Sequence, residues 1–296
     1  MKRLLILSGK GGTGKTTTAA AFIKLSNAKA IADCDVDAPN LHLINKEISD
    51  PEVSDFYGGD KAFIELDKCI SCGKCQEKCR FKAINHDNDG RFMINEFLCE
   101  GCGVCEYVCP VKAVSLIPDI AGKQKLYLQD GVFSTAELKM GRGNSGKLVT
   151  AVKLAMLKNA RDAELVIADG SPGIGCPVMA SMSGMDMVLI VAEPSYSGLS
   201  DLKRLVDIVI KQEIKLAVCI NKYDISPYMT RRIEEYCKEN NIPFTGVIPY
   251  DYKASEMINH GKSLVETDCI SGDAIRSIYE KTMEILYKNY KYSNNN

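Results

Sequence analysis

A glycine-rich loop near the N-terminus, with the sequence SGKGGTGKTTT at residues 8–18, sets the framework for the chain. It matches the pattern G-x-x-x-x-G-K-[ST] and lies between an apolar run at 4–7 and helix-forming residues at 15–25. This strand–loop–helix context predicts a phosphate-binding loop, in which backbone N–H groups surround a phosphate. Lys15 would contact the β- and γ-phosphates, and the Thr16 hydroxyl would bind Mg²⁺. The predicted nucleotide contacts in the loop are Gly9, Lys10, Gly11, Gly12, Thr13, Gly14, Lys15, Thr16 and Thr17.

The overall composition excludes several classes of function. Of the 296 residues, 46% are hydrophobic and 25% are charged, which is ordinary for a globular protein with a large core. A net charge of −1 without a Lys/Arg-rich run gives no footprint for nucleic acid or anionic lipid. No apolar stretch approaches the roughly 18 residues of a membrane span, and no signal-peptide pattern follows Met1. We therefore expect a cytoplasmic protein that binds neither nucleic acid nor membrane.

Short apolar segments alternate with helix-forming segments, which predicts an α/β fold with a mostly parallel sheet flanked by helices. The predicted strands include residues 3–8, 29–33, 164–168, 187–192 and 215–220. Asp33, Asp35 and Asp37 follow the second of these strands, and Asp169 follows the third. Because α/β sheets bind ligands at the carboxyl ends of their strands, we expect Asp33 and Asp35 to be functional. Asp37 could equally cap a turn or a helix.

The extra Lys10 in the loop and the Asp-x-Asp after the second strand resemble the MinD/Mrp/ParA group of P-loop ATPases. The nitrogenase iron protein belongs to the same wider class. The resemblance implies a nucleotide-dependent homodimer in which Lys10 reaches the phosphates of the partner subunit. It also implies that Asp35 positions the attacking water and that Asp33 lies near the Mg²⁺ ion. Lys10, Lys15, Asp35 and Asp169 are thus the candidate catalytic residues.

Residues 169–177, DGSPGIGCP, resemble the second-switch motif of the same group. The resemblance implies that Asp169 holds Mg²⁺ through water, together with Thr16 and Asp33, and that the Gly173 backbone contacts the γ-phosphate. In this group the asparagine equivalent to Asn221 contacts the purine, and the strand end near Pro249 also contacts the base. An ordinary turn would explain Pro249 as well.

The choice of nucleotide stays open at one point. Residues 221–224 have the sequence NKYD, and Asn-Lys-x-Asp is also the guanine-binding pattern of GTPases, in which Asp224 would accept hydrogen bonds from the base. The type of phosphate loop favours Mg-ATP, and this tetrapeptide keeps GTP as the alternative.

Eight of the thirteen cysteines fall between Cys69 and Cys109. They form two runs of the pattern C-x₂-C-x₂-C-x₃-C, the second followed by Pro110, and this pattern is typical of bacterial ferredoxins with two [4Fe–4S] clusters. In such proteins the fourth cysteine of each run binds the other cluster. The predicted ligands are Cys69, Cys72, Cys75 and Cys109 for one cluster and Cys99, Cys102, Cys105 and Cys79 for the other. Zinc sites normally have a different spacing, and disulfides would require export.

The cysteine runs divide the chain into predicted domains. Ala83-Ile84 and Ala113-Val114 occupy matching places after the two runs, which indicates an internal repeat, and the α/β pattern resumes after Pro118. We expect a small α+β two-cluster ferredoxin-like domain at 59–118. It would be inserted into a discontinuous ATPase domain at 1–58 and 119–292, with a frayed tail at 293–296.

Two further features have open interpretations. Residues 141–147, GRGNSGK, could form a second anion-binding loop through Arg142 and Lys147, or a solvated turn that caps the next helix. The nitrogenase iron protein carries a cluster-binding cysteine in the loop comparable to that of Cys176. Cys176 could therefore lie at a dimer interface near a redox partner or a labile cluster; the alternative is a small buried thiol.

Three functions are compatible with these motifs. The first is an ATPase in which the nucleotide state controls low-potential electron transfer through two [4Fe–4S] clusters to a redox partner. The second is an assembly factor that delivers iron–sulfur clusters or another metallocofactor to a partner protein, although the paired C-terminal cysteines of Mrp-type carriers are missing. The third is a positioning ATPase like MinD or ParA in which the ferredoxin-like domain senses redox state.

Overall fold

The computed structural model describes residues 1–43 and 50–288. The predicted tail at 293–296 lies outside this range. The chain forms two compact units. Unit 1 comprises Met1–Val53, Gln124–Glu137 and Ser145–Asn296, and unit 2 comprises Ser54–Lys123 and Leu138–Asn144.

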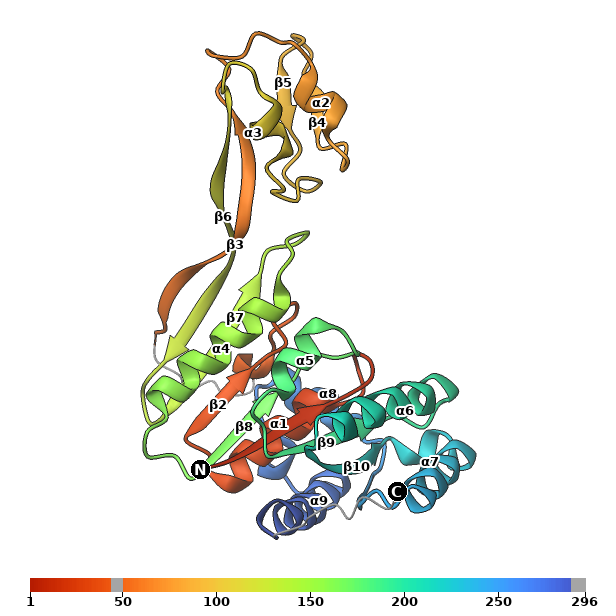
Figure 1. Ribbon diagram of the computed structural model, residues 1–296. Helices are drawn as coiled ribbons and strands as arrows, with labels where there is room; N and C mark the ends of the chain where they lie inside the picture. The colour runs from red at the N-terminus through yellow and green to blue at the C-terminus, as the bar shows by residue number, and fades with distance from the viewer. Residues whose placement is uncertain (44–49, 289–296) are drawn as a thin grey trace. The chain divides into compact units, whose positions relative to one another are not determined.

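Unit 1 is built on a mostly parallel sheet, which confirms the predicted α/β fold (Figure 1). Its strands are β1 (Lys2–Leu7), β2 (Ala30–Asp33), β7 (Val132–Leu138), β8 (Leu165–Asp169), β9 (Met187–Ala192), β10 (Lys215–Asn221) and β11 (Phe244–Ile248). They lie in the order β11-β10-β9-β1-β8-β2-β7. Every residue of β9 is buried, as expected for a parallel strand covered by helices on both faces.

Helices cover both faces of this sheet (Figure 1). They are α1 (Lys15–Ser26), α4 (Ser145–Asn159), α5 (Cys176–Met182), α6 (Tyr196–Lys211), α7 (Pro227–Glu239), α8 (Tyr252–Asn259) and α9 (Ile270–Tyr287), with short 3₁₀ turns at Leu41–Leu43, Tyr223–Ile225 and Leu264–Glu266. Phe22 of α1 and Ile275 of α9 join Leu4 and Ile6 of β1 in one buried core. Helix α4 packs against α5 and β2. No helix in the described part of the chain is long and apolar enough to cross a membrane.

Two long strands, β3 (Glu52–Ile64) and β6 (Val114–Tyr127), extend the strand order beyond β7 and carry the chain from unit 1 into unit 2. Pro118 suggests a break, but β6 continues through it, which a proline permits where its missing N–H is not needed for pairing.

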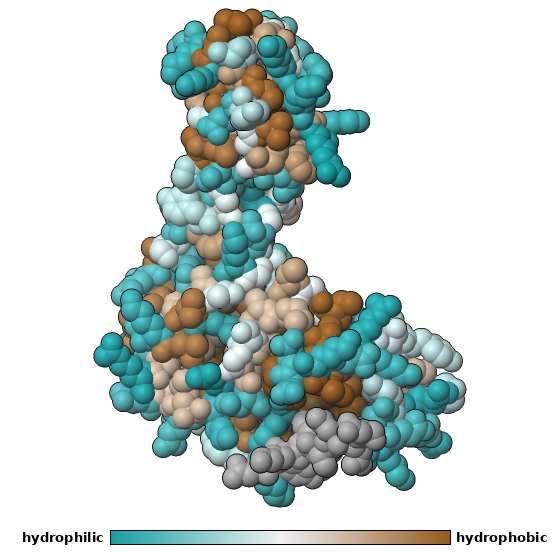
Figure 2. Space-filling view, viewed as in Figure 1, coloured by the Kyte–Doolittle hydropathy of each residue, from teal (hydrophilic) through white to brown (hydrophobic). Residues whose placement is uncertain are grey.

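Unit 2 contains β4 (Ile84–His86), β5 (Phe92–Ile94), α2 (Lys74–Lys78) and α3 (Val104–Val108) together with the outer parts of β3 and β6. Strands β4 and β5 are antiparallel. Three of the eight clustered cysteines, Cys75, Cys99 and Cys105, belong to the buried core of this unit with Ile84, Phe92 and Val114, and three more, Cys69, Cys79 and Cys109, are partly buried against it. Figure 2 shows hydrophobic residues exposed among hydrophilic ones on this unit. Unit 2 extends beyond the expected limits of 59–118 and includes Leu138–Asn144; its assignment as an inserted domain stays a prediction.

Candidate functional site

The phosphate-binding loop lies between β1 and α1, as its sequence predicts. Gly14 has a left-handed backbone (φ 92°), and a Cβ atom at this position would overlap the Asn221 side-chain amide. Only glycine fits at this position, because it adopts a left-handed backbone readily and has no Cβ atom that would overlap Asn221. The Asn221 Nδ2 atom donates to the Thr13 carbonyl at 2.8 Å, and the Lys222 ammonium donates to the Gly12 carbonyl at 3.3 Å. The residues at the end of β10 thus stabilise the conformation of the loop.

Lys15 and Thr16 converge on Asp169. The Lys15 ammonium lies 2.6 Å from Asp169 Oδ1 and 3.6 Å from Asp35 Oδ2, and the Thr16 hydroxyl donates to Asp169 Oδ2 at 2.6 Å. These groups meet because β1 and β8 are parallel neighbours, with Ile6 opposite Asp169. A carboxylate and a threonine hydroxyl supply the oxygen ligands that Mg²⁺ prefers.

The charges of this cluster are buried and strongly coupled. The Lys15 side chain is 6% exposed and that of Asp169 is fully buried. Burial acts to lower the pKa of Lys15, but the negative charges of Asp169 and Asp35 outweigh burial and the pKa is raised. Burial, reinforced by repulsion from Asp169, raises the pKa of Asp33 to about 8. Burial also raises the pKa of Asp35, against the attraction of Lys15. A second cation bound here would relieve the repulsion among these carboxyl groups.

The Asp33 side chain binds backbone N–H groups. Its carboxylate accepts hydrogen bonds from the N–H groups of Asp35 and Leu41, both at 3.1 Å. It also lies beside Asp169 in the register of β2 and β8. Asp33 therefore holds the segment that presents Asp35, while Asp37 is exposed.

A cavity of about 700 Å³ extends from the phosphate-binding loop to the strand ends of β10 and β11. This volume is within the range of small-molecule sites. The predicted residues that line it are Gly11, Gly12, Gly14, Lys15, Thr16, Thr17, Asp35, Asn221 and Pro249. Sequence reasoning missed Ser171, Lys222, Tyr250, Asp251 and Ile275, which also line it. Lys222 and Tyr250 lie next to predicted contacts and could have been included, whereas nothing in the sequence places α9 at this cavity.

Three other predicted nucleotide contacts, Gly9, Gly173 and Asp224, do not line the cavity themselves. The Asp224 carboxylate accepts a hydrogen bond from the Tyr250 N–H at 2.7 Å. The Gly173 N–H donates to the Ser8 carbonyl at 3.0 Å. A Cβ atom at Gly9 would overlap Asp201 of α6, so the close approach of that helix explains this glycine.

Lys10 makes contacts within its own chain. Its ammonium lies 2.5 Å from Glu193 Oε2 and within 3.4 Å of the hydroxyl groups of Ser195 and Ser197. Glu193 and Ser195 lie between β9 and α6, and Ser197 lies in the first turn of α6. Lys10 is thus paired on the β9 side of β1, whereas the Lys15 ammonium contacts Asp169 at the end of β8, the neighbour of β1 on its other side.

Residues 4–265 match the family model of the CobQ/CobB/MinD/ParA nucleotide binding domain. The chain belongs to this family. The resemblance to the MinD/Mrp/ParA group is thereby confirmed at the family level, and nucleotide binding by the domain with it. The roles of the individual loop residues stay predictions.

Individual relatives match over almost the whole chain. An uncharacterized protein of Methanocaldococcus jannaschii is 33% identical over 302 residues, which cover 96% of this chain and 97% of the relative. The iron-sulfur cluster carrier protein of Pyrococcus abyssi is 26% identical over 96% of this chain and 86% of its own. The cell division ATPase MinD of Pyrococcus furiosus has a similar fold, with a TM-score of 0.58 and 18% identity over 96% of this chain and 99% of that protein.

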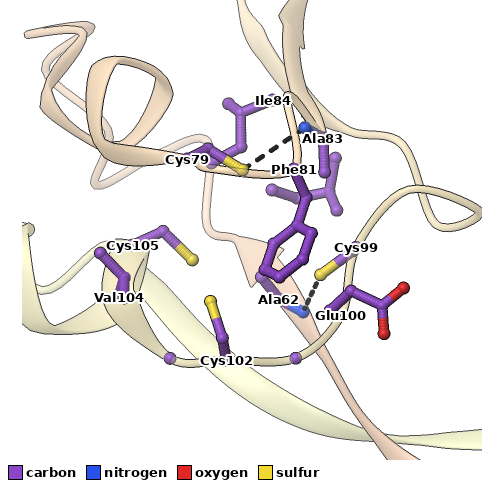
Figure 3. Close-up of a pocket in the computed structure, with 13 residues that line it drawn as sticks. Ala62, Cys79, Phe81, Ala83, Ile84, Cys99, Glu100, Cys102, Val104 and Cys105 are labelled. Atoms are coloured by element: carbon purple, nitrogen blue, oxygen red, sulfur yellow. Dashed lines mark hydrogen bonds between the residues drawn. The ribbon is translucent and has the colours of Figure 1, made fainter.

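In this member of the CobQ/CobB/MinD/ParA family, unit 2 carries a second candidate site. Cys99, Cys102 and Cys105 line a small cavity together with Cys79, the fourth cysteine of the other run (Figure 3). Figure 3 shows their sulfur atoms around a common space next to the Phe81 ring. The cysteines of two separate runs therefore meet at one place.

Backbone N–H groups point at several of these sulfur atoms. Ala83 donates to Cys79 Sγ at 3.4 Å, and Ala62 donates to Cys99 Sγ at 3.5 Å. In the other half of the unit, Ala113 donates to Cys109 Sγ at 3.2 Å. Such hydrogen bonds stabilise the thiolate form that binds metal.

The cysteines of the first run also lie near one another. Burial raises the pKa of Cys75, and the neighbouring Cys69 and Cys72 thiols add to the rise. All thirteen cysteines are free thiols. Within the described residues, no three His, Cys, Asp or Glu side chains converge on a single-ion site.

The two features with open interpretations become clearer. The Arg142 guanidinium lies 2.7 Å from Glu96 and 3.0 Å from Asp119, so its charge is already paired and the turn is favoured over an anion site at 141–147. Cys176 is exposed at the first residue of α5, and the alternative of a buried thiol is therefore wrong.

Proposed function

We propose that this chain is a Mg-ATP-dependent ATPase whose nucleotide state controls electron transfer through two [4Fe–4S] clusters. The observation that carries the proposal is the meeting of Cys79 with Cys99, Cys102 and Cys105 around one cavity. Two-cluster ferredoxins use this crossed set, three cysteines from one run and the fourth from the other.

The donor set fits a cubane cluster better than a single ion. Each cysteine of a [4Fe–4S] site binds a different iron, so four sulfur atoms surround a space and do not converge on a point. The lining of Ala62, Phe81, Ala83 and Ile84 is apolar, and N–H groups donate to the sulfur atoms. Cluster potentials depend on such hydrogen bonds and on exposure to solvent. A bound cluster would supply one-electron chemistry at this place.

In unit 1, the residues of the loop would bind and orient the triphosphate. Lys15 would exchange part of its contact with Asp169 for the β- and γ-phosphates, and Asp169 and Thr16 would hold Mg²⁺. Asp35, which is less buried and faces the cavity, would orient a water molecule for attack. Hydrolysis would then depend on positioning and charge stabilisation. We propose ATP as the nucleotide because the Asp224 carboxylate, the guanine-binding group of GTPases, accepts from the Tyr250 backbone and does not line the cavity.

The proposed active form is a nucleotide-dependent homodimer. For Lys10 to reach the phosphates of a second subunit, its ammonium must leave Glu193 and the two serine hydroxyl groups. The negative charge of a triphosphate provides the competing partner. Lys10 would thus link nucleotide binding to assembly.

The test is an anaerobic redox titration with and without Mg-ATP, in which EPR reports each cluster. We expect two [4Fe–4S] signals and an iron content of about eight atoms per chain. We also expect the reduction potential of the clusters to shift on addition of Mg-ATP. The control is the double variant Lys15→Ala/Asp169→Asn, which removes a buried cation and a buried anion together and should abolish the shift. Preparations without cluster signals would refute the cluster assignment. Cluster reduction potentials that do not change on addition of Mg-ATP would refute the coupling.

The second candidate is an ATP-dependent iron–sulfur or metallocofactor assembly factor. The similarity to the iron-sulfur cluster carrier protein of Pyrococcus abyssi favours it. In unit 1, however, Cys34, Cys219, Cys237 and Cys269 are buried, which leaves Cys176 as the exposed thiol of that unit among the described residues. Incubation with an apo-acceptor protein separates the two functions: ATP-dependent loss of iron to the acceptor would support assembly, and retention of iron supports electron transfer. A positioning function would instead require stimulation of the ATPase by lipid or DNA.

A further inference from the structure

The two cysteine-containing halves of unit 2 have nearly the same backbone. Residues 68–82 and 98–112 correspond with an offset of 30, and their helices, α2 and α3, are both five residues long. Gly73 and Gly103 have φ angles of 76° and 77°. Lys82 and Lys112 are also left-handed, at 52° and 51°. The fold therefore requires the same backbone conformation in both halves.

Their surfaces nevertheless differ in charge. Residues 68–82 carry five basic side chains and one acidic side chain, a net charge of +4, whereas 98–112 carry two acidic and one basic, a net charge of −1. At four equivalent positions, the first half has a basic residue where the second half has an apolar residue or proline. The pairs are Lys68 and Leu98, Lys74 and Val104, Lys78 and Val108, and Arg80 and Pro110.

We define the basic half as the side chains of Lys68, Lys74, Lys78, Arg80 and Lys82, all of which are exposed. Lys68 and Lys78 pair with Glu65 and Glu77, their near neighbours in sequence. Lys74, Arg80 and Lys82 form no ion pair within the described residues.

Stability does not explain these charges. Exposed ion pairs contribute little to folding, and repulsion among like charges opposes it. The second half adopts the same backbone with apolar residues at four of the five positions. The basic side chains are therefore free to serve recognition, since the fold does not require them.

We propose that the basic half is the docking surface for an acidic electron-transfer protein. The proposal rests on the proposed function, because an electron carrier must approach the cysteine sites. Cys69, Cys72, Cys75 and Cys79 lie within the same fifteen residues as the basic side chains. A carboxylate-rich partner attracted to this surface would be brought next to those cysteines, and opposite charges would raise its rate of association.

The geometry favours a protein over a polyanion such as nucleic acid. Nucleic-acid sites present basic residues along an extended face, whereas these five are confined to one half and are followed by Glu100 and Glu106 in the other. The whole chain, at a net charge of −1, provides no wider basic field. A compact acidic surface on a small redox protein matches the limited extent of the basic half.

The experiment compares two variants with the same change in net charge, prepared anaerobically as full chains. The test variant is Lys74→Gln/Lys78→Gln/Arg80→Gln/Lys82→Gln. The control, Lys158→Gln/Lys211→Gln/Lys238→Gln/Lys281→Gln, removes four exposed charges from unit 1. The probe is an immobilised plant-type [2Fe–2S] ferredoxin, an acidic one-electron carrier, and biolayer interferometry measures its association at low and high salt.

At low salt we expect association of the test variant to be about tenfold slower than that of the parent, with the control near the parent and the difference lost at high salt. Equal effects of the two variants would overturn the proposal, as would tighter binding of basic cytochrome c, DNA or anionic vesicles than of the acidic ferredoxin. Iron content and EPR spectra of the same preparations test the proposed function independently of the docking measurement. Missing clusters would refute that function, whereas intact clusters with no charge-dependent docking would refute the docking surface alone.

Discussion

Replacing Lys15 with alanine should destabilise the nucleotide-free protein as well as abolish nucleotide binding. The Asp169 carboxylate is fully buried and would lose a cation at 2.6 Å, and Asp35 would lose the same cation at 3.6 Å. Removal of one partner from a buried ion pair costs about 3–5 kcal/mol, because the other charge stays buried without compensation. The loss is a large fraction of the roughly 5–15 kcal/mol that keeps a domain folded. A lack of ATPase activity in Lys15→Ala alone would therefore not prove a catalytic role.

Urea unfolding followed by far-UV circular dichroism, without nucleotide or Mg²⁺, measures this effect. We expect the second substitution in Lys15→Ala/Asp169→Asn to recover most of the loss, since both charges are then absent. Lys24→Ala is the matched control. Its pair with Glu266 spans 3.5 Å between side chains that are 35% and 39% exposed, and such pairs contribute at most about 1 kcal/mol. The reasoning fails if Lys15→Ala is as stable as the parent, or if Asp169→Asn adds to its loss.

Three further outcomes are expected. Cys79→Ser should alter the EPR signal of the same cluster that Cys102→Ser alters, because the two thiols line one cavity; separate effects would contradict the crossed assignment. Asn221→Ala removes the hydrogen bond to the Thr13 carbonyl and should weaken Mg-ATP binding about tenfold, measured by calorimetry, with unfolding changed by at most about 1.5 kcal/mol. Cys176→Ala should leave iron content, ATPase rate and dimerisation unchanged, because the exposed thiol has no hydrogen bond within the described residues; loss of any of the three would give Cys176 a functional role.

Local patterns predicted the parts of the site that neighbouring residues determine. The apolar β1, the glycines and Lys15 lie within the first fifteen residues, and the backbone of such a loop leaves few alternatives. Asp169 could be assigned because it ends a buried strand, and the parallel pairing of β8 with β1 brings it to the loop. The α/β class followed from the alternation of apolar and helical segments.

Contacts between distant segments could not be predicted in the same way. Lys10 pairs with Glu193, far along the chain, and nothing around Glu193 indicates such a partner. Gly9 looks like another phosphate-binding glycine, but its lack of a side chain serves the close approach of Asp201. Pro118 lies inside β6, which composition alone does not show.

Helix α4 is tied to α5 within unit 1 by a buried charge. The buried Lys153 ammonium of α4 donates to the carbonyl groups of Ala180, Ser181 and Ser183 at the C-terminal end of α5. These bonds place a cation at the negative end of the helix, where it is favourable, although burial lowers the pKa of Lys153. Helix α5 begins directly after the loop that follows Asp169, and α4 begins directly after the last residue of unit 2. A change in that loop that moved α5 would therefore either break three hydrogen bonds or carry α4 with it. Because breaking them would leave a buried charge unpaired, movement of both helices together is the less costly response.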